Sequence, residues 1–329
     1  MRDTAISPTV DFDADGIQHG FLKLPYSHDA SAWGSIMIPI TVAKGGSGPT
    51  VLFSGGNHGD EYEGPVALYD LAATLDPAQI NGRIIIVPAM NFPAFRAAKR
   101  TSPIDQGNMN RLFPGDPAGT VTQKIADYFQ RYLLPLADVV VDIHSGGKTL
   151  DFVPFCASHV LADKALQSRT EAAVDAFNAP YSLTLLEIDA VGMYDTAAEE
   201  LGKIFITTEL GGGGTAHSET VAVAKKGVRN VLKHSGVLCG EPELTPSRRL
   251  DMPDGRSFVS AETSGLLEIC QPLGARVTAG TLLAKIYDVE RTGAAPALYH
   301  SPIDGILTGR HFPGLISIGD IVAVVAVEV

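Results

Sequence analysis

Residues 50–65 read TVLFSGGNHGDEYEGP, and the fold class follows from their pattern. The first five, Thr50–Ser54, form an apolar run typical of a buried strand, and Pro65 suits the beginning of a helix. A strand, a glycine-rich turn and a helix in this order are the repeating unit of a wound α/β sheet. Ligands bind such sheets at the carboxyl ends of the strands, where this turn lies.

The turn contains two candidate metal ligands, His58 and Glu61, three residues apart. An imidazole nitrogen and a carboxylate at this spacing can meet at one ion, and the flanking glycines let the backbone approach closely. The pair by itself is a weak signal, because chance and surface salt bridges often produce the same spacing.

A second apolar strand, Asp138–Ile143, leads to His144 and a Ser-Gly-Gly turn. A lone histidine after a strand is more often a packed residue, but two histidines and one glutamate at sheet edges match the ligands of catalytic zinc. Asp142 lies on the same strand face as His144 and can orient that ligand from behind. It can equally be a strand-end carboxylate that backbone amides satisfy.

A third strand, Lys203–Thr208, leads to Glu209 and then to four glycines at 211–214. The glycines leave room for a substrate beside the carboxylate. A glutamate there can take a proton from an attacking water and pass it to a leaving amine, as amide hydrolysis requires. The alternative is a structural carboxylate paired with a lysine, and these residues alone do not choose between the two.

From about residue 50 to 235, short β-branched runs alternate with amphipathic stretches, which predicts a sheet flanked by helices. Arg83–Val87 is a further predicted strand, and residues 1–45 are predicted to be β-rich. Helical spacing of apolar residues predicts helices at Leu68–Leu75, Val121–Leu133, Ala162–Phe177 and Ser218–His234.

After the proline-rich stretch 240–255 the pattern changes to short alternating strands with glycines and no helix. We therefore predict a catalytic domain over residues 1–250 and a small all-β domain over 251–329. Residues 274–280 and 301–306 resemble parts of the barrel-sandwich of biotinyl and lipoyl modules. Those carriers present a lysine at a hairpin tip, and no such motif stands between the two halves here, where residues 287–300 read YDVERTGAAPALYH. This favours a structural or gating module.

Composition excludes several classes of function. The chain has 25 Lys+Arg against 37 Asp+Glu, a net charge of −12, which repels nucleic acids and anionic membrane surfaces. It has neither a signal peptide nor an apolar stretch near the roughly 20 residues that span a bilayer, so a cytoplasmic location is expected. Cys156, Cys239 and Cys270 lie far apart, and each is expected to be a small core residue.

Six motifs in order carry a family resemblance: GGNHGDEYEGP at 55–65, NFP at 91–93, RTSPID at 100–105, NMNRLFPG at 108–115, DIHS at 142–145 and TELG at 208–211. Together they resemble the succinylglutamate desuccinylase and aspartoacylase family, a branch of the zinc carboxypeptidase superfamily. The resemblance implies a zinc-carboxypeptidase-like mixed sheet flanked by helices, with a small C-terminal all-β domain.

The resemblance also implies roles for individual residues. His58, Glu61 and His144 match the ligands of one zinc ion per chain, and Glu209 matches the general base and acid. Arg100 matches the arginine that polarises the scissile carbonyl and stabilises its oxyanion. Asn110 and Arg111 match the pair that binds the α-carboxylate of the substrate, for which a forked guanidinium is well suited.

The implied activity is hydrolysis of the amide of a small N-α-acyl amino acid. Length and layout are most similar to the family's deacetylases acting on N-α-acetyl-2,4-diaminobutyrate in ectoine breakdown, so this substrate is expected. Glu187 and Asp195 are candidates for binding its side-chain ammonium. A homo-oligomer, a dimer, is expected as well.

Three other functions stay open. The first is hydrolysis of succinylglutamate or an acylaspartate, and the second is peptide cleavage, which needs an open cleft. The third is a non-catalytic zinc-binding scaffold, which retention of Glu209 and Arg100 disfavours.

Overall fold

Four parallel strands form the centre of the computed structural model, which describes residues 4–186 and 190–329. In spatial order they are β5 (Gly82–Val87), β4 (Thr50–Gly55), β6 (Val139–His144) and β10 (Ile204–Glu209). The four predicted strands are thereby confirmed. β4 and β6 are buried along their whole length, as expected of apolar strands that are covered on both faces.

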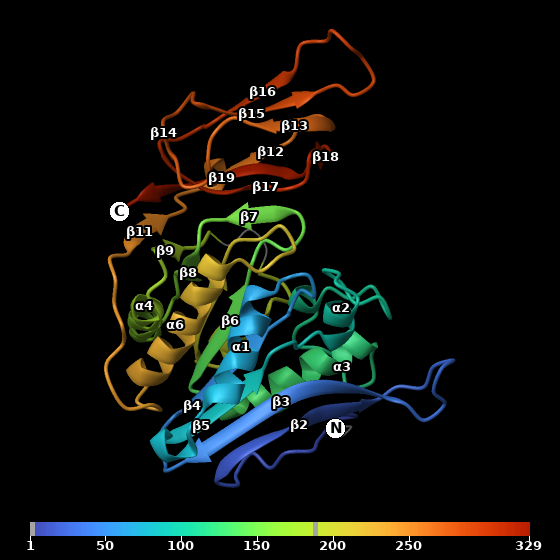
Figure 1. Cartoon of the computed structure of the whole chain (residues 1–329), viewed down its shortest axis with the longest axis vertical. Helices are drawn as coiled ribbons and strands as arrows, with labels where there is room; N and C mark the ends of the chain where they lie inside the picture. The colour runs from blue at the N-terminus through green and yellow to red at the C-terminus, as the bar shows by residue number, and fades with distance from the viewer. Residues whose placement is uncertain (1–3, 187–189) are drawn as a thin grey trace.

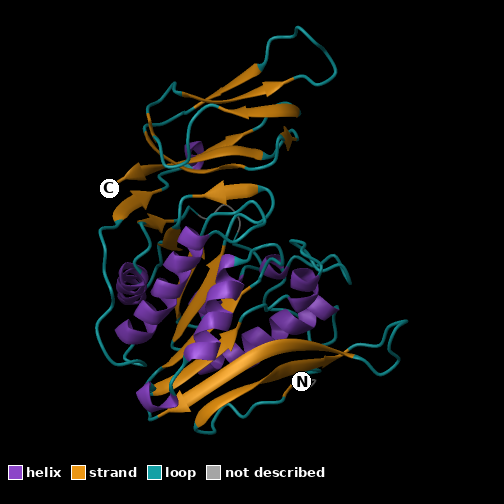
Figure 2. Ribbon diagram, in the orientation of Figure 1, coloured by secondary structure: helices purple, strands orange, loops and turns teal. Residues whose placement is uncertain are grey.

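Helices cover both faces of these strands (Figures 1 and 2). On one face lie α1 (Glu63–Thr74), α4 (Lys164–Phe177) and α6 (Ser218–His234), which share a core with the sheet. On the other lie α3 (Val121–Tyr128) with its π-helical continuation η3 (Phe129–Leu133), and α5 (Tyr194–Glu200). The predicted helices are confirmed. The pattern did not reveal α5, because its 7 residues are too few to show a period.

The N-terminal segment is β-rich, as predicted. β1 (Ser7–Pro8), β2 (Gly16–Pro25) and β3 (Ser35–Gly45) are antiparallel neighbours, and β3 pairs antiparallel with β5. They extend the central sheet on one side, at the bottom of Figure 1.

On its other side the sheet continues through β8 and into the C-terminal region. The successive strands are β8 (Phe155–Ser158), β9 (Tyr181–Thr184), β11 (Arg248–Asp251), β19 (Ile321–Glu328), β17 (Gly305–His311) and β14 (Arg276–Val277). β12 (Phe258–Ser260) pairs with β19, and β7 (Leu150–Phe152) pairs with β17.

A smaller sheet packs over this extension and completes the tail. Its strands are β16 (Ala297–His300), β15 (Leu282–Tyr287), β13 (Gly265–Ile269) and β18 (Leu315–Ile316). The tail's own core, which includes Leu283, Ile286, Leu307 and Val325, lies between the two layers. Besides strands, turns and loops, residues 251–329 hold one short 3-10 helix, η5 (Gly255–Ser257), which confirms the prediction of a tail without an α-helix.

The predicted domain boundary at residue 250 falls within β11. This strand pairs with β9 on one side and with β19 on the other, so the sheet is continuous across that position. An apolar group that we call the junction cluster, containing Phe155, Leu183, Leu250, Ile306 and Val324, joins the two regions. The division into two domains stays a prediction.

The remaining helical pieces are α2 (Phe92–Arg96), η1 (Pro77–Gln79), η2 (Met109–Arg111) and η4 (Leu134–Leu136). Across residues 4–186 and 190–329, no helix has the length and apolar character needed to cross a membrane. Cys156 is buried and Cys270 is only partly buried, and the expectation of a core position is wrong for Cys239. Cys239 is exposed because it lies on the surface loop that follows α6.

Candidate active site

The three predicted metal ligands meet at the carboxyl end of the central strands. His58 and Glu61 lie on the turn between β4 and α1, and His144 is the last residue of β6. β4 and β6 are parallel neighbours with Gly55 opposite Ile143, so the residues after β4 and the end of β6 lie side by side. Two segments far apart in sequence thus deliver their polar residues to one place.

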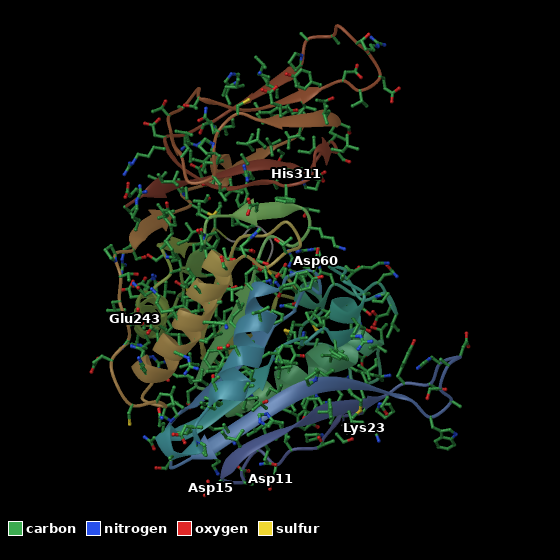
Figure 3. The ribbon with its side chains drawn as sticks, in the orientation of Figure 1. Asp11, Asp15, Lys23, Asp60, Glu243 and His311 are labelled. Carbon is green, nitrogen blue, oxygen red and sulfur yellow. The ribbon has the colours of Figure 1, made fainter. Side chains whose placement is uncertain are left out.

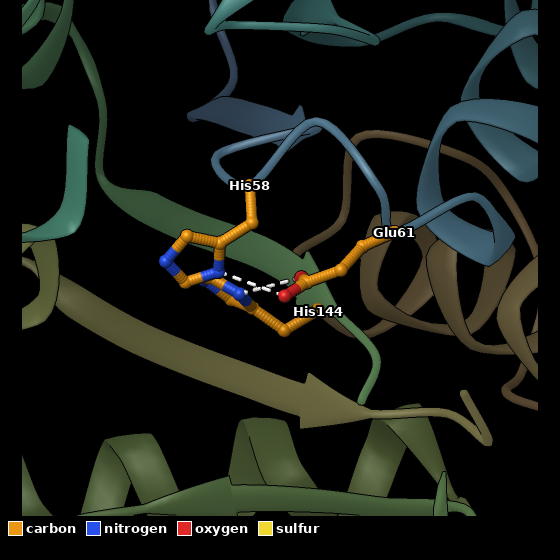
Figure 4. Close-up of side chains that lie close together, drawn as sticks. All are labelled: His58, Glu61 and His144. Atoms are coloured by element: carbon orange, nitrogen blue, oxygen red, sulfur yellow. Dashed lines mark hydrogen bonds and ion pairs between the residues drawn. The ribbon is translucent and has the colours of Figure 1, made fainter. Parts of the chain in front are cut away.

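The Glu61 carboxylate contacts both imidazoles (Figure 4). Its Oε1 is 2.8 Å from Nδ1 of His58, and its Oε2 is 2.9 Å from Nδ1 of His144. One ligand atom from each residue lies within 4.8 Å of the others, and all three side chains are buried. Two imidazole nitrogens and a carboxylate are the donor set of catalytic zinc sites.

In each histidine, the ring nitrogen that does not face Glu61, Nε2, contacts a side-chain oxygen of a second residue. Nε2 of His144 is 2.7 Å from Oδ2 of Asp142, and Nε2 of His58 is 3.2 Å from Oδ1 of Asn108. An Nε2–H that donates to these oxygens leaves the lone pair of Nδ1 directed toward Glu61, as a metal ligand requires. The residues present therefore fit a zinc ion.

Asp142 is itself fixed by two donors. Ser54 Oγ donates to Oδ1 at 2.8 Å, and Asn57 Nδ2 donates to Oδ2 at 2.9 Å. These contacts place Asp142 where a residue that orients His144 has to stand. In the alternative, backbone amides would satisfy Asp142 as a strand-end carboxylate, but both of these donors are side chains.

The electrostatic environment also favours a cation. Burial lowers the pKa of His58 and keeps this ring neutral. Burial acts in the same direction on His144, but Asp142 and Glu61 outweigh it and raise the pKa of His144 well above its usual value. The potential beside His144 is therefore negative, and a metal cation can take the place of the proton there.

The turn that holds these residues is packed closely against its neighbours. A Cβ on Gly59 would overlap the backbone of Ala94 and Phe95, so only glycine fits that position. Asp60 accepts a hydrogen bond from the backbone N–H of Lys148 at 3.0 Å through its Oδ2. Figure 3 shows Asp60 below the tail region in which His311 lies.

Glu209 is positioned beside the three ligands by β10. In the parallel pairing of β10 with β6 it lies opposite His144. Its Oε2 is buried and has no hydrogen-bond partner within the described residues. Burial, and secondarily the Glu61 carboxylate, raise the pKa of Glu209 to about 8. A carboxylate of this kind can accept a proton near neutral pH.

The predicted polar loop residues reach the same region. Nη1 of Arg100 lies 3.5 Å from Oε1 of Glu61, and half of the Arg100 side chain is exposed. Arg111 is exposed, and its Nη1 donates to the carbonyl of Asn110 at 2.6 Å. Asn110 is buried, and its Oδ1 accepts from the backbone N–H of Tyr194 at 2.9 Å.

A cavity of about 440 Å³ connects these groups. His58, His144, Glu209, Arg100 and the pair at 110–111 all line it. The rest of the lining is mainly apolar and comes from the sheet, the connection between β9 and α5, and the tail: Leu150, Phe152, Phe155, Leu183, Leu185, Leu186, Met193, Phe205, Met252, Phe258, Ile321 and Val324. A cavity with mainly apolar walls and a few polar groups is typical of a small-molecule site.

Sequence reasoning assigned no role to Asn57 or Asn108. Both belong to quoted motifs, Asn57 directly before His58 and Asn108 two residues before Asn110, so their position was the available signal. Of the two proposed ammonium-binding residues, Asp195 lines the cavity. Glu187 lies outside the described residues.

Comparisons with known proteins agree with this geometry. The family model for the succinylglutamate desuccinylase/aspartoacylase catalytic domain matches residues 47–235. The N-α-acetyl-L-2,4-diaminobutyric acid deacetylase of Halomonas elongata is 54% identical over 328 residues, which cover 99% of this chain and 96% of that protein.

Solved structures are similar over the whole chain. The product-bound ectoine utilization protein EutE of Ruegeria pomeroyi has a TM-score of 0.98 and 61% identity, and the match covers 99% of this chain and 100% of that one. A Silicibacter protein described as a succinylglutamate desuccinylase has a TM-score of 0.97 and 61% identity, with complete coverage of both chains.

Proposed function

This chain belongs to the succinylglutamate desuccinylase and aspartoacylase family, and we propose that it hydrolyses N-α-acetyl-L-2,4-diaminobutyrate to acetate and 2,4-diaminobutyrate. The observation that carries the proposal is the cluster of His58, Glu61 and His144 beside a cavity that His58, His144 and Glu209 line. The identity of 54% to the Halomonas deacetylase over nearly the whole chain supports the choice of substrate.

His58, Glu61 and His144 would hold one zinc ion per chain, the metal that the family implies. When bound, the ion supplies Lewis-acid polarisation of the amide carbonyl and makes a nearby water more acidic. Asp142 and Asn108 keep the two imidazoles in the tautomer that this coordination needs.

Side chains of the protein then transfer the proton of the attacking water and stabilise the negative charge that develops on the carbonyl oxygen. Glu209 accepts a proton from the attacking water and returns it to the amine nitrogen as the C–N bond breaks. The guanidinium of Arg100 stabilises the oxyanion that develops at the carbonyl. Arg111 and Asn110 bind the α-carboxylate, which orients the amide toward Glu209.

The apolar lining of the cavity supports a small acyl group. Phe155, Leu183 and Val324 of the junction cluster line the cavity together with Phe258 of the tail. An acetyl group can bury its methyl among such residues.

The test is a comparison of kcat/KM for N-α-acetyl-2,4-diaminobutyrate, N-succinylglutamate and N-acetylaspartate with zinc-loaded enzyme. We expect the first to be preferred by at least about ten-fold. Glu209→Gln is the matched control: it should keep zinc and the fold while losing turnover of all three compounds. Faster hydrolysis of either other substrate would refute the assignment of the substrate.

Desuccinylation of succinylglutamate is the second candidate. It is favoured by the Silicibacter structure, which is described by that activity and is 61% identical to this chain. The same three-substrate comparison decides between the two candidates. Zinc-loaded enzyme that hydrolyses none of the compounds would instead favour the non-catalytic scaffold.

A further inference from the structure

Asp195 is a buried carboxylate that the reaction described above does not use. It lies in the first turn of α5, is 6% exposed, and lines the cavity. Its Oδ1 accepts from the backbone N–H of Thr196 at 2.5 Å and from the Thr196 hydroxyl at 3.2 Å. Its Oδ2 lies 4.0 Å from Nε2 of His159.

The charge of Asp195 is incompletely balanced by the protein. Within the described ranges, no Lys or Arg side chain forms an ion pair with it. His159 is shared, because its Nδ1 lies 3.2 Å from Oε1 of Glu199 on the same helix. One imidazole cannot neutralise two carboxylates, and a buried carboxylate is costly without a cationic partner. A cationic ligand group in the cavity would supply that partner.

The position of Asp195 is coupled to the residues assigned to the α-carboxylate. The backbone N–H of Tyr194, its neighbour, donates to Oδ1 of Asn110 at 2.9 Å. The fully buried Tyr194 ring stacks on Phe113 with ring centres 4.8 Å apart. The N–H of Phe113 also donates to the carbonyl of Gly192 at 3.0 Å. The spacing between Asn110 and Asp195 is therefore set by rigid contacts.

We propose that Asp195 binds the side-chain ammonium of the substrate and so selects an N-acylated short-chain diamino acid; the inference rests on the proposed deacetylase function. Arg111 and Asn110 hold the α-carboxylate, and the fixed spacing to Asp195 sets the length of side chain that reaches it. The same carboxylate repels the side-chain carboxylates of acylaspartate and succinylglutamate. Attraction and repulsion together make Asp195 a determinant of specificity.

Asp195→Asn tests the charge at nearly constant size. Two substrates are compared, N-α-acetyl-2,4-diaminobutyrate and N-acetyl-2-aminobutyrate, which has the same carbon chain but no side-chain ammonium. The wild-type enzyme should prefer the first by at least about ten-fold in kcat/KM, mostly through KM. In Asp195→Asn the preference should disappear, while kcat/KM for the aminobutyrate compound stays the same.

Two further variants separate charge, distance and folding. Glu200→Gln removes the same charge from the exposed end of α5 and should keep the wild-type preference. Asp195→Glu keeps the charge but is one methylene longer. Asp195→Glu should shift the preference toward the shorter N-α-acetyl-2,3-diaminopropionate. If thermal melting shows that Asp195→Asn is unfolded, this shift is the test of whether Asp195 binds the ammonium.

The outcomes distinguish the two proposals. Wild-type enzyme that hydrolyses neither acetylated compound would overturn the deacetylase function and this inference with it. If the wild-type enzyme prefers the diaminobutyrate compound and a folded Asp195→Asn keeps that preference, only the assignment of Asp195 is overturned. An equal loss of preference in Glu200→Gln would also overturn the assignment of Asp195. The preference would then come from the total negative charge of α5 and not from one carboxylate.

Discussion

Glu61 and Asp142 show how single side chains prepare the candidate metal site. Glu61 accepts on both oxygens, one facing each imidazole, and its Oε2 also accepts from the backbone N–H of Ser145 at 3.2 Å. Asp142 accepts from Ser54 and Asn57 and leaves an oxygen at His144. Because every one of these groups is buried, loss of a single partner changes the orientation of a ligand.

Asp142→Asn should weaken zinc binding without removing a ligand. An amide in place of the carboxylate cannot make His144 as basic, and we expect a loss of about 10–100-fold in zinc affinity. Competition with a chromogenic chelator measures this affinity. Asp175→Asn, which alters an exposed ion pair with Arg249, is the control. Unchanged zinc affinity in Asp142→Asn would remove Asp142 from its orienting role.

The ionisation of Glu209 predicts the acid limb of the pH–rate profile. Burial raises the pKa of Glu209 from 4.5 to about 8, and a bound dication lowers it again. The ionised base exists above this pKa, so kcat/KM should fall as the pH falls through a value between 4.5 and about 8. Zinc content measured at each pH shows whether loss of metal contributes. A flat profile over this range with constant zinc would contradict the role of Glu209.

Turns at the ends of β4, β6 and β10 carry the site, and their close packing explains the glycines in the sequence. Gly59 brings the β4–α1 turn against α2, where its missing Cβ would overlap backbone. The four glycines at 211–214 all have positive φ, a conformation that side-chain-bearing residues rarely adopt. The glycines thus allow both the close packing of these turns and their backbone conformation.

Gly59→Ala should displace the β4–α1 turn, since the obstacle is backbone and cannot rotate away. We expect loss of stoichiometric zinc and of activity. Gly255→Ala is the matched control, because nothing lies within 4 Å of a Cβ there and its φ is not positive. Elemental analysis and turnover measure both variants. Full zinc content in Gly59→Ala would show that the turn tolerates the shift.

The tail contributes part of the cavity wall, so the two regions of the molecule act together. Two adjacent residues of β17 pack into different clusters. Ile306 belongs to the junction cluster, whereas Leu307 belongs to the tail's own core. Both are almost completely buried. Packing at Ile306 therefore affects the cavity in a way that packing at Leu307 does not.

Ile306→Ala and Leu307→Ala should each lower the free energy of unfolding by about 2–5 kcal/mol, because each leaves a buried cavity. Only Ile306→Ala should also lower kcat/KM, because it loosens the junction beside the substrate cavity. Denaturant unfolding and steady-state kinetics make the comparison. Equal losses of kcat/KM in the two variants would contradict a special role of Ile306, because packing anywhere in the tail would then affect the cavity.

Local patterns in the sequence determined the elements that build the site. Apolar runs predicted β4, β5, β6 and β10, and apolar residues at helical spacing predicted α6 with its observed bounds, because both signals come from neighbours in the chain. His58, Glu61, His144 and Glu209 stood out because each follows or ends such a strand. Motif order supplied the family, and the family supplied the expected roles.

Tertiary structure alone decided which distant residues meet. The alternation of strand residues already indicated that Asp142 can reach His144, but nothing local to Asn108 indicates that it contacts His58. Likewise, nothing local to β11 indicates that it joins β9 to β19. The sequence offered Asp195 as one of two candidates for binding the substrate ammonium. Contacts from Tyr194 to Asn110 and Phe113 hold it at the cavity. These relations depend on hydrogen bonds and packing between segments far apart in the chain, which local periodicity does not encode.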